Sequence, residues 1–264
     1  MKLIRYLALN NIAARREALE LIKSGKVSVN GSAVFDATLP IDPEKDIVKA
    51  GGRTLRGTPE FFYILMNKPA GFLTARNDEK KRPTVYDILF DKKLFKIAAA
   101  DLWRGKNEEF IYKKYLEFKK MNINYAGRLD FNTSGALIFS NDGEFIQDLI
   151  HPSADIPKTY RVKIFRHLNE REIGVFQKAV YVDIDGKKVK FKAVFKHIRK
   201  LQSDMIVVID IFSGENRIIK RAFQQMGHPV ITLSRLNIGK IGLKGLPLGF
   251  YRFLERHEIA EYLR

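Results

Sequence analysis

The segment over residues 125–143, YAGRLDFNTSGALIFSNDG, constrains the fold and the chemistry of this chain more than any other segment. Two glycines bracket a short loop that carries the acidic residue Asp130 between two large apolar side chains. The apolar run at 136–139 predicts a buried strand, and the Asn-Asp-Gly at 141–143 predicts a turn that caps a following helix. The pattern indicates one carboxylate held on a tight loop before a core strand, which suits nucleophilic or acid–base chemistry.

The loop also permits a purely structural interpretation. An aspartate in a Gly-rich loop is more often structural than catalytic, because its side chain can hydrogen-bond its own turn. The hydroxyls of Thr133 and Ser134 can tie the backbone of the same loop. The role of Asp130 therefore has to be decided by the other motifs of the chain.

The composition indicates a polyanionic partner. The chain has 264 residues, of which 45% are hydrophobic, enough for about two domains with a sizeable core. Lys and Arg number 47 against 30 Asp and Glu, a net charge of +17. Nucleic acid relieves the self-repulsion of such a charge. An anionic membrane surface is the weaker alternative, because no basic amphipathic helix is joined to an apolar anchor. No apolar run approaches the ~20 residues needed to span a bilayer.

Several classes of site are disfavoured by the residues the chain lacks. There is no cysteine, which excludes disulfides and Cys-ligated metals, and the five His are dispersed without metal-ligand spacing. We do not expect the basic N-terminus to act as a signal peptide, because Arg5 interrupts its short apolar stretch and no small-residue cleavage site follows. We expect a cytoplasmic protein without metal or cofactor, and a monomer.

The first part of the chain predicts a small RNA-binding domain. Residues 2–10 and 13–24 are expected to form helices, and Asn30-Gly31 is a strong hairpin signal. Helix, helix and hairpin resemble the S4 domain, here over residues 1–57. We expect contacts to RNA phosphates from four basic residues, Arg15, Arg16, Lys23 and Lys26. A solvated charged face is the alternative.

Several motifs resemble one enzyme family. The segment GRLDFNTSGALIFSNDG is similar to the catalytic motif of the RNA pseudouridine synthases, in the branch that modifies single uridines of ribosomal RNA and carries an S4-type domain. Further family-like motifs are NKPxG at 67–71, RPTVYDxL at 82–89, Lys-x-Tyr at 158–160 and LSRLNIG at 233–239. The first two are given structural or RNA-adjacent roles.

One stretch departs from the family. Residues 90–124 are longer than the usual connection and hold a charged, apparently helical insertion, with nine Lys/Arg and five Asp/Glu between 91 and 120. A solvated surface helix is the preferred interpretation. An extra RNA-contact element is the alternative, since aromatic side chains interleave with the basic ones.

The resemblance implies a role for each motif residue. Asp130 acts at the sugar, as nucleophile or base, and the adjacent Arg128 fills the space of the flipped base or grips a phosphate. Tyr160 stacks on the target ring. Lys220 aligns with the basic partner of the catalytic acid, and we predict that it contacts Asp130 within ~6 Å, since a cation in contact keeps a carboxylate ionised. Two further substrate-binding candidates are Arg217, the fallback partner, and Leu236.

The expected fold is α+β, with an S4-type α/β domain at 1–57 and a largely antiparallel catalytic domain at 60–264. The resemblance implies cofactor-free isomerisation of a uridine in ribosomal RNA, 23S rather than 16S, in free RNA or a subunit assembly intermediate. A non-catalytic S4-domain assembly factor explains the charge equally well, but it does not need Asp130, Tyr160 or Lys220. A glycosidase is disfavoured, because no second acid stands out beside Asp130.

Overall fold

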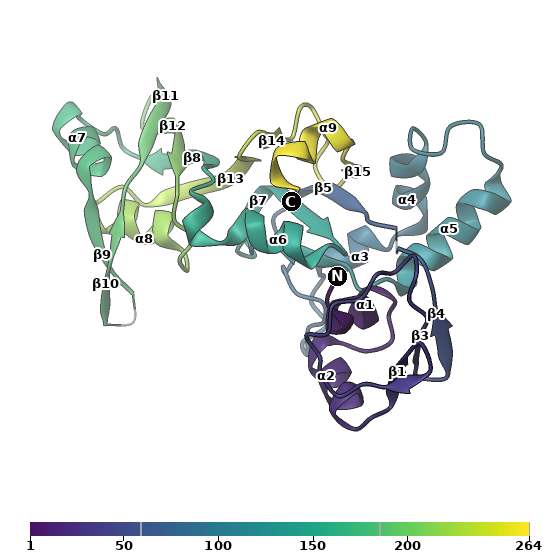
Figure 1. The fold of residues 1–264 in the computed structure, drawn as a ribbon. Helices are drawn as coiled ribbons and strands as arrows, with labels where there is room; N and C mark the ends of the chain where they lie inside the picture. Colours follow the sequence, from purple (N-terminus) through teal and green to yellow (C-terminus); the bar gives the residue numbers. More distant parts are fainter. Residues whose placement is uncertain (59, 185, 264) are drawn as a thin grey trace. The chain divides into compact units, whose positions relative to one another are not determined.

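The computed structural model describes residues 1–58, 60–184 and 186–263, without the side chains of Arg15 and Pro152. The chain forms two compact units (Figure 1). The first comprises Met1–Phe62 and Gly105–Asn124, and the second comprises Tyr63–Arg104 and Tyr125–Arg264. The insertion expected at 90–124 is therefore divided between the units. Within the described ranges no helix is long and apolar enough to cross a bilayer.

The first unit places two helices on a small antiparallel sheet of order β2-β1-β3-β4. Its elements are α1 (Leu3–Leu9), α2 (Arg15–Lys23), β1 (Val27–Val29), β2 (Ser32–Ala33), β3 (Val48–Ala50) and β4 (Arg53–Leu55). The predicted helix pair and hairpin are confirmed. Asn30 and Gly31 both have positive φ, 51° and 90°, as the tight turn between β1 and β2 requires. The apolar faces of both helices meet the sheet in one core, which includes Tyr6, Ile22 and Val48.

The insertion is helical as predicted, and its helix α5 (Glu108–Lys120) belongs to the first unit. Most of α5 is exposed, but Phe118 is fully buried and meets Phe62 edge-on, with ring centroids 5.8 Å apart. Lys114 also bridges Glu60 at 3.2 Å. The helix is thus more than a solvated surface element, because it supplies part of the core of its unit.

The second unit is built on a nine-stranded sheet of order β11-β12-β8-β13-β7-β5-β15, with β14 beside β13 and β6 beside β7. Its strands are β5 (Tyr63–Lys68), β6 (Asn124–Ala126), β7 (Thr133–Ser140), β8 (Lys158–Phe165), β11 (Val194–Lys200), β12 (Asp204–Ile211), β13 (Val230–Ile238), β14 (Ile241–Gly242) and β15 (Tyr251–Phe253). Neighbours along the main path run antiparallel except β13 and β7, which are parallel. The prediction of a largely antiparallel sheet is confirmed.

Helices and one separate hairpin complete the second unit. They are α3 (Val85–Leu89), α4 (Lys92–Ala99), α6 (Gly143–Ile150), the 3-10 turn Pro152–Ala154, α7 (Glu170–Lys178), β9 (Val180–Ile184), β10 (Lys187–Phe191), α8 (Ile218–Gln225), α9 (Arg256–Ile259) and the 3-10 turn Ala260–Tyr262. The helices α7 and α8 pack with the hairpin at one end of this unit (Figure 1). Their core stacks Phe176 on Phe223 at 4.5 Å, and Phe191 of β10 meets Phe176 edge-on.

The strand after the Asp130 loop is as the sequence predicts. Residues 136–139 lie in β7 and are fully buried. Asp142 is the N-cap of α6, and its Oδ1 accepts hydrogen bonds from the amides of Glu144 (3.1 Å) and Phe145 (3.4 Å). The Asp130 loop therefore leads into β7, a buried strand whose C-terminal end is followed directly by the capped helix α6.

Gly135 allows β7 and β13 to approach closely. Its φ is +112°, and a Cβ at this position would lie 2.1 Å from the carbonyl oxygen of Arg235. Neither the backbone conformation nor the neighbouring strand tolerates a side chain here. This glycine therefore fixes how closely the Asp130 loop approaches β13.

We expect Gly135→Ala to lower the free energy of unfolding by about 2 kcal/mol or more, since backbone strain alone costs on the order of 1–3 kcal/mol. Thermal unfolding measures the change. The matched control is Gly174→Ala in α7, where the added Cβ meets nothing within 4 Å. That substitution is expected to raise stability by about 0.5–1 kcal/mol. Equal melting temperatures for the two variants would contradict this account of Gly135.

Candidate active site

Asp130 and Lys220 form an ion pair. Asp130 lies on the loop before β7, Lys220 lies in the first turn of α8, and Lys220 Nζ is 2.9 Å from Asp130 Oδ2. The predicted contact is confirmed. Arg217, the alternative partner, is the N-cap of α8, with a φ of 52° and an exposed side chain. Among the described contacts it forms no bond to Asp130.

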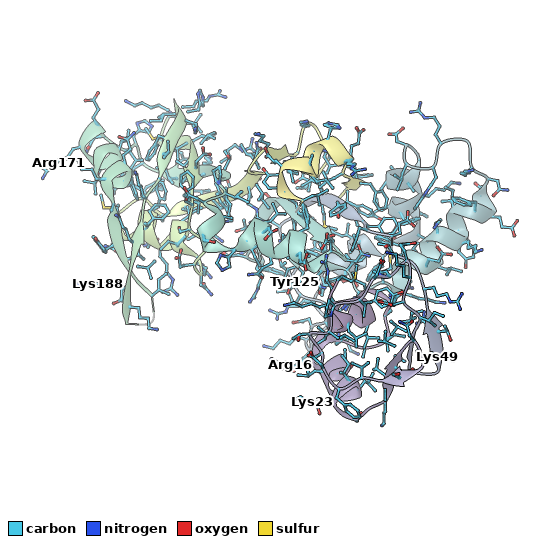
Figure 2. All side chains as sticks on the ribbon, viewed as in Figure 1. Arg16, Lys23, Lys49, Tyr125, Arg171 and Lys188 are labelled. Carbon is cyan, nitrogen blue, oxygen red and sulfur yellow. The ribbon has the colours of Figure 1, made fainter. Side chains whose placement is uncertain are left out.

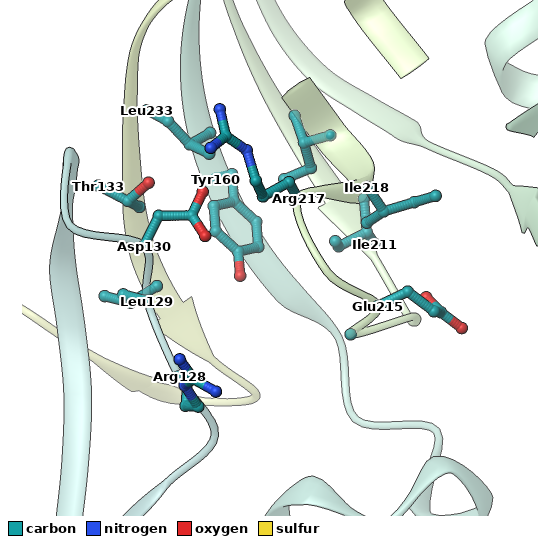
Figure 3. A pocket seen from close by; sticks show the side chains of 12 residues that line it. Arg128, Leu129, Asp130, Thr133, Tyr160, Ile211, Glu215, Arg217, Ile218 and Leu233 are labelled. Atoms are coloured by element: carbon teal, nitrogen blue, oxygen red, sulfur yellow. The ribbon is translucent and has the colours of Figure 1, made fainter. Parts of the chain in front are cut away.

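Asp130 of this pair lines a small cavity of about 60 Å³. Tyr160 of β8 forms one wall and is only 7% exposed, and the carboxylate of Asp130 points toward its ring (Figure 3). The remaining lining residues are Arg128, Leu129, Thr133, Ile211, Gly214, Glu215, Arg217, Ile218, Ile219 and Leu233. The carboxylate and the aromatic ring named from the sequence thus face the same space.

A larger cavity of about 450 Å³ adjoins the first. The two share Arg128, Tyr160, Gly214 and Glu215, and the larger one adds the cationic side chains of Lys158 and Arg235. Burial lowers the pKa of Lys158; the positive charge of Arg235 lowers it further, whereas Glu215 raises it. The volume lies in the range of small-molecule sites, so the two cavities together offer a site of nucleoside size with cations on its wall.

Three buried polar atoms along these cavities have no hydrogen-bond partner among the described residues: Thr133 Oγ1, Ser213 Oγ and Arg235 Nη2. The Thr133 hydroxyl therefore does not tie the loop backbone, although the Thr133 amide donates to the Asp130 carbonyl at 3.0 Å. An unpaired buried polar atom costs about 1–3 kcal/mol. These atoms are therefore suited to bind a polar ligand.

Arg235 was missed by the sequence analysis, which named Leu236 from the same motif. Arg235 is 2% exposed, and its Nε donates to the Ala136 carbonyl oxygen at 2.7 Å. Leu236 lines neither cavity. Leu233 and Arg235, two residues apart on β13, each line one of the cavities. Leu236 lies where the register of β13 against β8 shifts, between Arg235 and Asn237. The arginine within the motif LSRLNIG was the available signal.

The backbone of the Asp130 loop is held by Lys68, which sequence reasoning placed in a structural or RNA-adjacent motif. Lys68 is fully buried at the end of β5. Its ammonium donates to the carbonyl oxygens of Pro69 (3.0 Å), Asp130 (3.2 Å), Phe131 (3.4 Å) and Thr133 (2.8 Å). A charge without solvent requires such partners, so the loop must fold around the ammonium.

Residues that follow Lys68 also form hydrogen bonds to the backbone of the Asp130 loop. Thr74 Oγ1 donates to the Leu129 carbonyl at 2.8 Å and accepts from the Leu129 amide at 3.3 Å. The Gly71 amide donates to the Phe131 carbonyl at 2.8 Å. The segment 68–74 therefore positions the main chain on both sides of Asp130, which is the structural role expected of the motif.

The basic residues expected to contact RNA lie in the first unit. The side chains of Arg16, Lys23 and Lys26 are exposed, and that of Arg15 lies outside the described part of the chain. Arg16 and Lys23 belong to α2 (Figure 2). Lys26 lines an open groove of about 380 Å³ together with Lys49 and Arg53, two basic residues that the sequence analysis did not name.

Comparisons with known proteins identify the family. A family model described as RNA pseudouridylate synthase matches residues 62–225. The chain is 32% identical to ribosomal large subunit pseudouridine synthase B of Bacillus subtilis over 260 residues, which cover 98% of this chain and 93% of that protein. It is 28% identical to an uncharacterized RNA pseudouridine synthase of Aquifex aeolicus over 265 residues, which cover 100% and 97%.

The fold agrees with these matches. A crystal structure of a pseudouridylate synthase superimposes with a TM-score of 0.59 at 23% identity, and the alignment covers 100% of both chains. This chain therefore belongs to the RNA pseudouridylate synthase family and is an isomerase that acts on RNA.

We expect Lys68→Met to loosen the Asp130 loop. The substitution keeps most of the side-chain volume but leaves the loop carbonyls without a donor, so the free energy of unfolding should fall by about 2 kcal/mol. Hydrogen exchange measures the loop directly, and amides within 127–133 should exchange faster in the variant. Unchanged exchange there would show that Lys68 does not hold the loop.

The stabilities of the wild type and Lys68→Met should also differ in their dependence on pH. Burial lowers the pKa of Lys68 from 10.5 to about 8; Asp130 raises it and Lys220 lowers it. Between pH 8 and pH 10.5 the Lys68 side chain is mostly neutral in the folded protein and mostly protonated in the unfolded chain, so unfolding takes up a proton. The wild type therefore gains stability as the pH rises from about 8 to about 10.5. The stability deficit of Lys68→Met should widen over this window in denaturant titrations. A deficit that is constant or narrows would contradict the shift.

Proposed function

We propose that this enzyme converts a specific uridine of ribosomal RNA to pseudouridine with Asp130 as its catalytic carboxylate. The observation that carries the proposal is the ion pair of 2.9 Å between Lys220 and Asp130, whose carboxylate lines a cavity together with Tyr160. The ion pair holds the carboxylate in place, and a carboxylate held in this way can act as a nucleophile or a base.

The isomerisation of uridine to pseudouridine can proceed with one catalytic carboxylate and no second acid. In the isomerisation the bond between N1 and C1′ breaks, the uracil rotates, and a bond forms between C5 and C1′. The hydrogen at C5 leaves as a proton and N1 ends with a hydrogen, so atoms and charges balance without an added oxidant or reductant. Asp130 acts at the ribose, as nucleophile or as base, and Lys220 holds its carboxylate toward the cavity.

The cavities supply a place for the base. A uridine inside folded RNA must be flipped out, at a cost of a few kcal/mol, and one stacking contact returns about 1–3 kcal/mol. Tyr160 stacks on the flipped ring. The unpaired atoms of Thr133, Ser213 and Arg235 are suited to its polar edges. The exposed Arg128 fills the space left by the base or holds a neighbouring phosphate.

The choice of ribosomal RNA is supported by a relative and by charge. The 32% identical protein of Bacillus subtilis is named for the large ribosomal subunit, which favours 23S over 16S RNA. The first unit contributes exposed basic residues in the helix, helix and hairpin arrangement that resembles an S4 domain. Its role in the proposal is to position the RNA through phosphate contacts.

Tritium release tests the reaction. Because C5 loses its hydrogen, transcripts of 23S and 16S RNA labelled with tritium at uridine C5 should release it to water in stoichiometric amounts from one transcript only. Asp130→Asn keeps the shape of the side chain and removes its charge, and its rate should fall below about one-thousandth of wild type. Tritium release by Asp130→Asn at the wild-type rate would show that Asp130 is not the catalytic carboxylate.

The absence of release from naked RNA with binding retained would point to an assembly intermediate or to a non-catalytic role in assembly. Partly assembled subunits as substrate separate the two, since release from these particles establishes the enzyme. No release from either substrate would overturn the proposed reaction.

A second prediction concerns the partner of Asp130. Lys220→Met removes the cation and should lower kcat about 100- to 1,000-fold, the usual effect of deleting one preorganised charge partner. Lys220→Arg keeps the charge and should remain within about tenfold of wild type. Single-turnover rates at saturating RNA measure both. Equal rates for the methionine and arginine variants would mean that the charge of residue 220 is not used.

A further inference from the structure

A second concentration of positive charge lies in the second unit, in a stretch that no motif explains. Residues 186–200 contain seven Lys/Arg and no Asp or Glu. The seven are all exposed: Lys187, Lys188, Lys190, Lys192, Lys196, Arg199 and Lys200. Lys196 bridges Asp210 at 3.1 Å. Within the described part of the chain, the other six form no ion pair with a carboxylate.

The hairpin β9–β10 arranges part of this charge on one face. Val189 and Phe191 turn toward the core, where Phe191 is fully buried. Because side chains alternate along a strand, Lys188 and Lys190 share the opposite, solvent-exposed side. The exposed Lys192 follows the last residue of β10 directly. Figure 2 shows Lys188 on this hairpin. The packing of the core therefore fixes which way Lys188 and Lys190 face.

An aromatic side chain lies among these lysines. Tyr181 of β9 pairs directly with Lys190 in the register of the hairpin, so both lie on the same face. Tyr181 is 59% exposed, whereas its strand neighbours Val180 and Val182 are buried. A basic surface with an exposed aromatic ring is the composition that binds nucleic acid by phosphate contact and base stacking.

Edge protection is the competing explanation for the lysines. Charged side chains on an exposed strand keep it from pairing with another chain. That role makes no use of an exposed tyrosine, which would add apolar surface to the same face. Tyr181 therefore distinguishes a binding face from a protected edge.

The hairpin is joined to the catalytic helix. Gln225 Nε2 donates to the Tyr181 carbonyl at 3.0 Å, and Arg221 Nη1 donates to the Asp183 carbonyl at 3.4 Å. Both donors belong to α8, the helix that carries Lys220. Side chains of one helix thus fix the edge of β9 and the carboxylate of the active site.

We propose that Tyr181, Lys188, Lys190 and Lys192 form a binding face for the substrate RNA outside the flipped uridine. The lysines contact backbone phosphates, and Tyr181 stacks on an unpaired base of the flanking RNA. The inference rests on the proposed function, because it takes the same RNA as its ligand. In this proposal the hairpin β9–β10 is the element that holds the RNA near α8.

Binding of a 23S RNA transcript at several salt concentrations tests the lysines. The combined variant Lys188→Gln, Lys190→Gln and Lys192→Gln should lower the slope of log K against log salt by about 2, since each single-strand phosphate contact contributes about 0.7. Affinity should fall at least tenfold at low salt, while the single-turnover rate at saturating RNA stays near wild type. The matched control removes the same charge from α4, with Lys92→Gln, Lys93→Gln and Lys96→Gln, and should leave the slope nearly unchanged.

Single substitutions of Tyr181 test the stacking contact. Tyr181→Ala should weaken binding by about 5- to 150-fold, which corresponds to the loss of one base–aromatic stack, and Tyr181→Phe should bind as wild type does. Melting temperatures confirm that the variants are folded.

The inference is overturned if the hairpin variant and the α4 variant have the same salt slope, or if Tyr181→Ala binds like Tyr181→Phe. Edge protection alone predicts unchanged binding with aggregation of the lysine variant. Failure of the proposed function is a separate result, because it appears as absent tritium release by the wild type, while the binding comparison still decides the role of the hairpin.

Discussion

The active site depends on one buried ammonium. Lys68 lies at the end of β5 with no exposed surface, and its charge is acceptable there only because loop carbonyls surround it. Those carbonyls belong to the loop that presents Asp130. Two lysines thus bind the same loop in different ways: Lys68 fixes its main chain, and Lys220 fixes the carboxylate. The position of the carboxylate follows from both.

The sheet brings the remaining groups to this loop. The parallel pair β13–β7 sets Arg235 beside Gly135, and the antiparallel neighbour β8 contributes Lys158 and Tyr160. Each strand contributes only one or two polar side chains to the cavities. The site is therefore defined by the order of strands in the sheet, and it exists only once long-range pairing is complete.

The sequence was most informative where chemistry requires a particular side chain. Asp130, Tyr160 and Lys220 were named from motifs. The structure places Asp130 and Tyr160 on one cavity and Lys220 in contact with Asp130. Lys68 and Thr74 were not given their roles, because their partners are main-chain carbonyl and amide groups, which every residue carries and no pattern marks. Arg235 was missed in favour of its neighbour because the face of a strand that meets a cavity is a property of the fold. The division of the insertion between two units was also invisible, since it depends on the burial of Phe118 against Phe62.

The same division has a consequence for synthesis of the chain. The first unit includes α5, so its core lacks Phe118 until residues 105–124 have left the ribosome. A nascent chain that ends at residue 62 exposes the apolar ring of Phe62, which is 4% exposed in the finished unit. The N-terminal unit is thus translated first but completed later, after the first strand of its neighbour has already emerged. Its folding is tied to the order of translation in a way that a contiguous N-terminal domain avoids.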